Sequence, residues 1–128
     1  MTRFLIVAIG GALGATARYG LGRLLPTTTG WPWATFAANV VGGLLMGLLA
    51  GWLALRAGAH QESIRLFAAV GVLGGFTTFS AFSLETALMI ERRQFAIAGG
   101  YVAASVVLSV VALFLGLMIA RRAFGAAF

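Results

Sequence analysis

The chain has 128 residues, of which 61% are hydrophobic and 9% are charged, and its mean hydropathy is +1.01. Soluble domains are about half apolar and about a quarter charged, so this composition excludes that class. The apolar content also excludes a disordered chain, and the lack of cysteine excludes a disulfide scaffold. A membrane-spanning helix needs about 20 apolar residues, which leaves room for four spans and for no second, soluble domain. The sequence therefore predicts an all-α integral membrane protein with a single four-span domain over residues 1–128.

Four apolar runs follow one another along the chain. The predicted membrane spans are, in order, Phe4–Leu25, Trp33–Leu55, Ile64–Ile90 and Phe95–Ala120. Tryptophans lie near both ends of the second run, where an aromatic belt at the membrane interface is expected. A secretory signal peptide is a competing interpretation of the first run, because Arg3 and Ala15-Thr-Ala17 resemble a charged start and a cleavage site. The glycine content of the run and its continuation past Ala17 favour a membrane span.

Nine arginines and three glutamates, with no lysine or aspartate, give a formal net charge of +6. Nearly all the arginines lie at the ends of the runs, so we interpret them as membrane-flanking residues and not as a nucleic-acid patch, which would cluster on one face. With four spans, one side of the membrane would carry Arg3, Arg56, Arg65, Arg121 and Arg122. The other side would carry Arg23, Arg92 and Arg93, with Arg18 if its side chain snorkels that way. This small bias leaves open a single orientation and an antiparallel homodimer of chains inserted both ways.

Small residues recur about every four positions along three of the runs. In lipid, such stripes let helix backbones approach closely, so they predict helix–helix contacts. The stripes contain Gly10, Gly14 and Gly22 in the first run, Gly43, Gly47 and Gly51 in the second, and Ser105, Ser109, Ala112 and Gly116 in the fourth.

Three polar residues need more than helix packing to explain them, because a charge at mid-bilayer costs at least about 2.5–3.5 kcal/mol. Arg18 lies near the end of the first span, where its side chain could reach the interface and anchor the helix. Asn39 continues the glycine stripe of the second span, and its amide suits either an interhelical hydrogen bond or donation to an anion. Glu85, in the third span, suits either pairing with an arginine or lining a pathway.

The third run contains the segment Gly74-Gly-Phe-Thr-Thr-Phe-Ser-Ala-Phe-Ser83. Adjacent glycines and several hydroxyl residues are poor sequence for a continuous helix, so we predict a broken third helix. Unwound backbone at membrane depth is tolerated only where protein buries it or where it lines a wet cavity. Such a break frees carbonyl groups for a cation and N–H groups for an anion. On a helix that resumes after it, Phe79 and Phe82 share one face, and their ring edges are weak donors to an anion.

Together with Asn39-Val-Val-Gly-Gly43 and Gly14-Ala-Thr-Ala-Arg18, this segment resembles the Fluc (CrcB-type) fluoride channels, and the resemblance extends over essentially the whole chain. The resemblance implies an antiparallel, dual-topology homodimer in the inner membrane of a bacterial or archaeal cell. It implies two pores through which fluoride leaves the cytoplasm passively, which relieves fluoride toxicity. The implied partners are fluoride, the lipid bilayer, a second copy of the chain and a structural Na⁺ at the dimer centre.

The resemblance also assigns residues. The implied pore residues are Asn39, Phe79, Phe82, Ser80, Ser83, Ser109, Tyr101 and Glu85, with Arg18 in a vestibule. Within this set, Asn39 would donate hydrogen bonds to fluoride, and the edges of the two phenylalanine rings would line the path. Backbone carbonyls of Gly74 and Thr77, from both subunits, would hold the sodium ion.

Two positions depart from the family pattern. Ala81 stands between the two phenylalanines where some relatives have a hydroxyl residue, and Leu113 stands one turn after Ser109 where some have threonine. The polar track is therefore thinner here, which bears on conduction rate and on the number of ion positions. Fluoride is small and tightly hydrated, so a narrow path dense in neutral donors suits it, whereas a full cationic site would trap it. Arginines at the pore mouths would raise the local anion concentration.

Other functional classes fit the sequence less well. A small dual-topology multidrug/proton antiporter needs an acidic residue in its first span, where this chain has Arg18. A non-transporting assembly subunit would need only the glycine stripes, and the predicted break argues against it. An enzyme is not expected, because the chain has no cysteine, no aspartate and a single histidine, His60, in a predicted loop.

Overall fold

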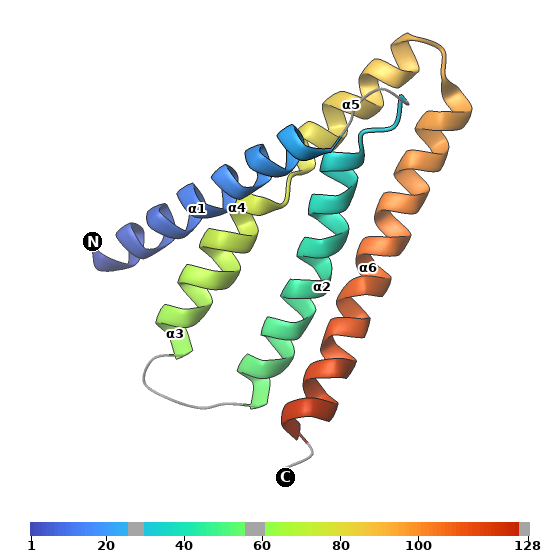
Figure 1. The fold of residues 1–128 in the computed structure, drawn as a ribbon. Coiled ribbons are helices and arrows are strands. Elements are labelled where there is room, and N and C mark those ends of the chain that lie inside the picture. Colours follow the sequence, from blue (N-terminus) through green and yellow to red (C-terminus); the bar gives the residue numbers. More distant parts are fainter. Residues whose placement is uncertain (26–29, 56–60, 126–128) are drawn as a thin grey trace.

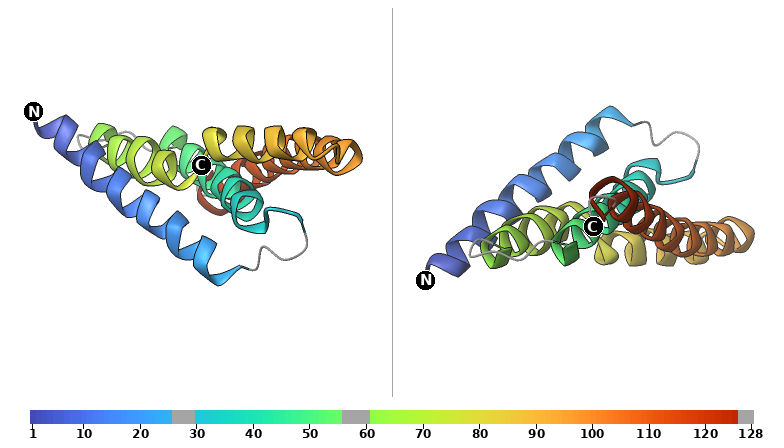
Figure 2. Two further views of the ribbon diagram at one scale, coloured as in Figure 1. Left: turned by 90° about the horizontal axis from the view of Figure 1, so that it is seen from above. Right: turned by 90° about the horizontal axis from the view of Figure 1, so that it is seen from below.

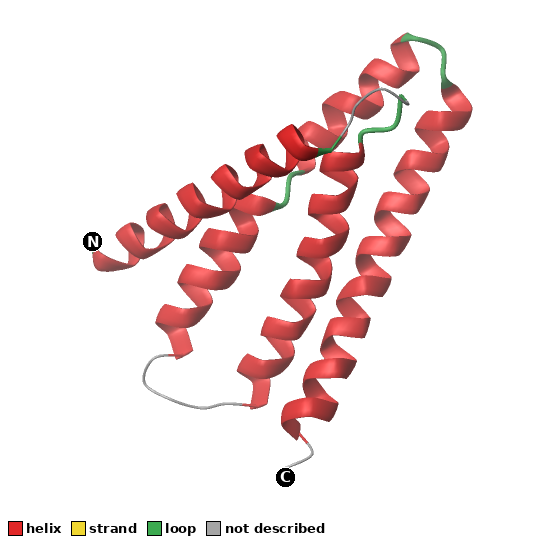
Figure 3. Ribbon diagram, in the orientation of Figure 1, coloured by secondary structure: helices red, strands yellow, loops and turns green. Residues whose placement is uncertain are grey.

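The protein is described here by a computed structural model, which covers residues 1–25, 30–55 and 61–125. Apart from short loops, these residues are helical (Figure 3). Four helical segments are long and apolar enough to cross a membrane, as the sequence predicts. Arg56 and His60, both predicted in a connection, lie outside the described residues. The chain is a multi-pass membrane protein.

Three of the four spans are single helices: α1 (Thr2–Leu24), α2 (Trp33–Leu55) and α6 (Phe95–Gly125). The other span, over residues 61–91, contains α3 (Gln61–Ile64), the π-helix η1 (Arg65–Leu73), α4 (Gly74–Phe76) and α5 (Phe79–Glu91) (Figure 1). Helix α6 extends past the predicted end at Ala120 to Gly125. Arg121 and Arg122 continue the helix because their long side chains can reach water while their backbone stays helical.

The spans pack as two pairs around α2. Helix α1 lies against η1 and α4, the first half of the third span, whereas α5, the second half, lies beside α6 (Figures 1 and 2). Helix α2 makes its most extensive contact with α6 and smaller ones with α1 and η1. The two halves of the third span therefore have different neighbours.

The backbones of α2 and α6 meet at the predicted glycine stripes. A Cβ atom placed on Gly47 would lie 2.0 Å from the Leu113 carbonyl oxygen, and one on Gly43 would lie 2.7 Å from the Ser109 carbonyl oxygen. In return, a Cβ on Gly116 would lie 2.4 Å from the carbonyl oxygen of Leu44. The obstructing atoms belong to the backbone, so any side chain at these glycines would push the helices apart.

Helix α1 meets the third span in the same way. A Cβ on Gly10 would lie 2.6 Å from the Phe67 carbonyl oxygen, and one on Gly14 would lie 2.0 Å from that of Val72. Both carbonyls belong to η1, whose hydrogen bonds span five residues instead of four and so widen the helix. The sequence stripe gave no sign of this π-helix. Gly22, the third member of the stripe, makes only a loose contact, 4.0 Å from the Ala34 Cβ.

Replacing Gly47 by alanine should destabilise the protein, because the added methyl group would collide with the α6 backbone. We expect a loss of about 1–3 kcal/mol, seen as a lower thermal unfolding midpoint of the detergent-solubilised protein. The matched control is Gly99→Ala on α6, where a Cβ meets nothing within 4 Å. This change should leave stability unchanged or raise it by about 0.5–1 kcal/mol. Equal midpoints for the two variants would contradict the tight α2–α6 contact.

Candidate functional site

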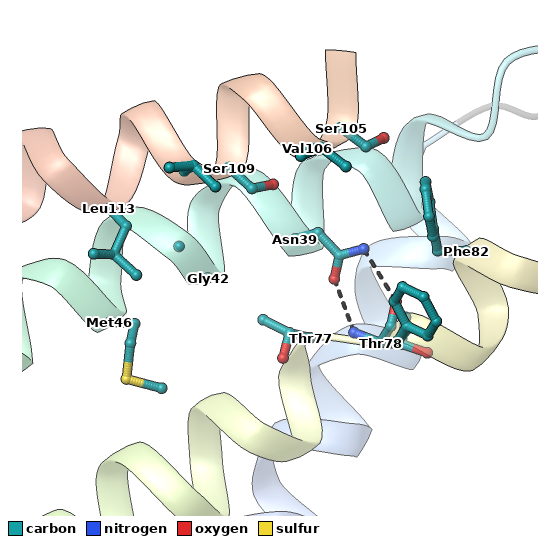
Figure 4. Close-up of a pocket in the computed structure, with 13 residues that line it drawn as sticks. Asn39, Gly42, Met46, Thr77, Thr78, Phe82, Ser105, Val106, Ser109 and Leu113 are labelled. Atoms are coloured by element: carbon teal, nitrogen blue, oxygen red, sulfur yellow. Dashed lines mark hydrogen bonds between the residues drawn. The ribbon is translucent and has the colours of Figure 1, made fainter. Parts of the chain in front are cut away.

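Asn39, on α2, pairs with the two extended residues between α4 and α5. Thr77 has φ −82° and ψ 157°, and Thr78 has φ −151° and ψ 120°. The Asn39 Nδ2 donates to the Thr78 carbonyl oxygen at 3.1 Å, and the Thr78 N–H donates to Asn39 Oδ1 at 2.8 Å (Figure 4). The amide thus pairs with the backbone as a neighbouring strand would. It satisfies both backbone polar groups of Thr78, which is buried.

The break in the helix redirects two backbone donors. In a continuous helix, the N–H groups of Thr78 and Ala81 would donate to the carbonyls of Gly74 and Thr77. Here the Thr78 N–H donates to Asn39, and the Ala81 N–H donates at 3.1 Å to Thr78 Oγ1, which caps the start of α5. The carbonyl groups of Gly74 and Thr77, predicted as cation ligands, are thereby released from those helical bonds.

A cavity of about 430 Å³ lies beside this pair. It is bounded by α2, by α6 and by the extended link, which consists of Thr77 and Thr78. Its walls are formed by Asn39, Gly42, Gly43, Met46, Thr77, Thr78, Phe79, Phe82, Ser105, Val106, Ser109, Val110 and Leu113 (Figure 4). The hydroxyls of Ser105 and Ser109 are buried and bond to no described residue. The Thr77 hydroxyl, in contrast, donates to the Leu73 carbonyl oxygen at 3.0 Å. The Thr78 hydroxyl is paired with Ser80 Oγ at 3.3 Å. The two serine hydroxyls and the second Nδ2 proton of Asn39 are therefore donors left for a ligand.

The structure brings some of the predicted site residues together and leaves others apart. Asn39, Phe79, Phe82, Thr77 and Ser109 line the cavity. The remaining predicted residues, which lie outside its wall, are Ser80, Ser83, Glu85, Tyr101, Gly74 and Arg18. In the single chain both serines and Gly74 are exposed, and Arg18 is half-buried on α1.

Glu85 and Tyr101 form a separate polar cluster that joins three helices. The Tyr101 hydroxyl donates to Glu85 Oε1 at 3.1 Å, and the Thr35 hydroxyl donates to Glu85 Oε2 at 3.1 Å. Tyr101 is completely buried. The Glu85 carboxylate also lines a second cavity, of about 180 Å³, whose wall includes Arg92 and Trp31. Neutral hydroxyls on α2 and α6 thus hold this carboxylate on α5.

A row of aromatic rings connects the cluster to the cavity. The ring centroids of Phe79 and Phe82 are 5.7 Å apart, and those of Phe82 and Tyr101 are 5.1 Å apart. Tyr101 in turn meets Trp31 edge to face, at 5.4 Å and 86°. Phe79, at the end of the row, is 78% exposed in the single chain. The row therefore begins in the packed interior and ends at a surface.

Sequence reasoning missed three contributors to this region. The sequence identifies Ser105 only as a member of a packing stripe, although its position four residues before Ser109 puts both hydroxyls on one face of α6. Thr78 supplies both the backbone that Asn39 binds and the cap of α5. Thr35 holds Glu85. The spacing from Thr35 to Asn39 places both on one side of α2 and was the available signal.

Comparison with known proteins places these residues in a family. The family described as "CrcB-like protein, Camphor Resistance (CrcB)" matches residues 5–117, which include every residue of the larger cavity. A protein named fluoride-specific ion channel FluC from Caulobacter sp. (strain K31) is 63% identical over 126 residues, covering 97% of this chain and 98% of the relative. Proteins of the same name from Phenylobacterium zucineum (strain HLK1) and Caulobacter vibrioides (strain NA1000 / CB15N) are 60% and 56% identical, each over 97% of this chain and 99% of the relative. By both comparisons, the chain belongs to the CrcB family.

Proposed function

We propose that this chain is a fluoride channel, the activity that its relatives' name gives for them. The observation that carries the proposal is the cavity beside the Asn39–Thr78 pair, where donors without partners meet two phenylalanine rings. Fluoride gives up its hydration shell only where several donors replace the water. Ser105, Ser109 and the free Nδ2 proton of Asn39 supply such donors.

The lack of arginine in the described cavity wall favours conduction of an anion over tight binding of that anion. No arginine is among the described residues that line the cavity, so an anion would meet neutral donors only. A channel needs binding that is favourable enough for entry and weak enough for release. The ring edges of Phe79 and Phe82 extend the path as weak, dry donors beyond the hydroxyls.

The pathway needs a second copy of the chain to close it. Phe79 is largely exposed, and Ser80 and Ser83 beside it on α5 are exposed too, so a single chain would leave a pore-lining face open to lipid. The near-balanced arginines suit chains that insert in both orientations. We infer an antiparallel, dual-topology homodimer with two pores in the inner membrane of a bacterial cell, through which fluoride leaves the cytoplasm down its gradient.

The backbone around the extended link fits a structural sodium ion at the dimer centre. The carbonyl groups of Gly74 and Thr77 have lost their helical donors to Asn39 and to the cap of α5, and Gly74 is exposed where a partner could approach. Four carbonyl oxygens, two from each subunit, would suit a hard cation. Bound there, sodium would supply a fixed positive charge and hold the two links together.

A proton-coupled antiporter is not favoured. Glu85, an acid within the third span, lies outside the cavity wall, and its two carboxylate oxygens accept hydrogen bonds from Thr35 and Tyr101. These bonds hold the carboxylate in place as part of the packing.

Fluoride should leave loaded proteoliposomes quickly, with little loss of chloride, and the double variant Phe79→Ile, Phe82→Ile should lose this efflux. Isoleucine keeps the apolar surface and removes the ring edges, so we expect a fall of at least about tenfold. The measurement is efflux read with a fluoride electrode, with chloride read in parallel. The control is Phe114→Ile with Phe124→Ile, two exposed rings of α6 outside the cavity. Absence of fluoride efflux from dimeric wild-type protein would refute the proposed function.

A cysteine at Ser63 should report dual orientation. The chain has no cysteine, and Ser63 is exposed on α3, so Ser63→Cys adds one accessible thiol without changing the charge. A membrane-impermeant maleimide applied to intact spheroplasts should label about half of the chains, because the charges favour neither orientation strongly. Lysed spheroplasts, in which every thiol is accessible, give the total. Complete labelling, or none, would rule out dual topology.

Sodium should stabilise the dimer. We expect a higher thermal unfolding midpoint in sodium chloride than in choline chloride at equal ionic strength, because a cation bound to the folded dimer alone stabilises it. Identical midpoints over a wide sodium range would argue against the site.

A further inference from the structure

The polar side chains of the larger cavity occupy only part of its length. Asn39, Thr78 and Ser105 lie toward the end near Phe82, whereas Met46 and Leu113 lie together at the other end (Figure 4). All five line the same cavity. The donors, with Ser109 in the middle, therefore stop short of the end where Met46 and Leu113 lie.

The polar side chains end at the same depth on both helices. On α6, Leu113 follows Ser105 and Ser109 at intervals of four residues, so it occupies the next place on the hydroxyl-bearing face. On α2, Met46 follows Asn39 by seven residues, two turns along the same face. Both side chains are half-buried, whereas the neighbouring Phe114 is 59% exposed. They thus face the cavity instead of lipid.

The helices cannot separate easily at this depth. The Cβ positions of Gly43 and Gly47 lie 2.7 Å and 2.0 Å from the carbonyl oxygens of Ser109 and Leu113, so the two backbones are already in contact. At this depth, the part of the cavity wall formed by α2 and α6 therefore presents the side chains of Met46 and Leu113.

We propose that Met46 and Leu113 form an apolar collar that limits the rate of anion passage. This inference rests on the proposed channel function. An ion leaving Ser109 toward the collar has no side-chain donor to replace the one it gives up, and a narrow apolar passage holds water poorly. Passage through the collar is the slow step, and the ion is bound by Asn39, Ser105 and Ser109 before it passes.

The test compares threonine with valine at position 113, because these residues have nearly the same shape and differ by one hydroxyl. We expect fluoride efflux from proteoliposomes to be about tenfold faster for Leu113→Thr than for Leu113→Val, since a hydrogen bond to an ion is among the stronger ones. Met46→Thr against Met46→Val should differ in the same direction. Leu108→Thr on α6, at a position that is 44% exposed and outside the cavity, should match the wild type.

Each outcome decides the proposal. Equal rates for the threonine and valine variants at both positions overturn the collar, because the added hydroxyl would then make no difference to the rate. Wild-type efflux distinguishes these results from failure of the proposed function, since a wild-type dimer that passes no fluoride overturns both. Positions 46 and 113 are tested by separate pairs of variants. If a variant at one position does not assemble as a dimer, the pair at the other position decides.

Discussion

The central constraint on this protein is that backbone polar groups inside a bilayer need partners from the protein itself. Thr77 and Thr78 leave the helix near the middle of the third span, and the Asn39 amide supplies a donor and an acceptor to Thr78. Without that pair, the extended link would leave a buried N–H and carbonyl unsatisfied, each at a cost of about 1–3 kcal/mol. The freed carbonyl of Gly74 follows from this pair, and that of Thr77 follows from the cap that Thr78 provides to α5.

The glycine contacts set the position of that pair. Because Gly43 and Gly47 bring α2 against α6, Asn39 on α2 and Ser109 on α6 reach the same cavity. Bulkier residues would hold the helices several ångströms further apart and separate the amide from the hydroxyls. Small residues therefore determine the chemistry of the site without supplying any polar group themselves.

Much of the fold could be predicted from the sequence, because the four helices follow from the apolar runs and the glycine stripes predict close helix contacts, although they do not say which helices pair. The role of Asn39 was only partly predictable. The sequence allows its amide either an interhelical hydrogen bond or donation to an anion, and in the structure the amide binds the Thr78 backbone. The π-helix η1 was not predictable, because a hydrogen bond to the fifth residue instead of the fourth leaves the apolar pattern nearly unchanged. The importance of Ser105 depends on the cavity, which exists only after α2, α5 and α6 pack.

The separate packing of the two halves of the third span has a mechanical consequence. Membrane helices respond to a thinner or thicker bilayer by changing their tilt. Helix α1 and η1 are joined closely at Gly10 and Gly14, so they tilt as one body, whereas the glycine contacts of α2 and α6 make these helices a second body. The two-residue link at Thr77 and Thr78 joins the bodies, and Asn39 ties its Thr78 end to the second one. A change in membrane thickness that tilts one body against the other would therefore act on this link before it acts on the wall formed by α2 and α6.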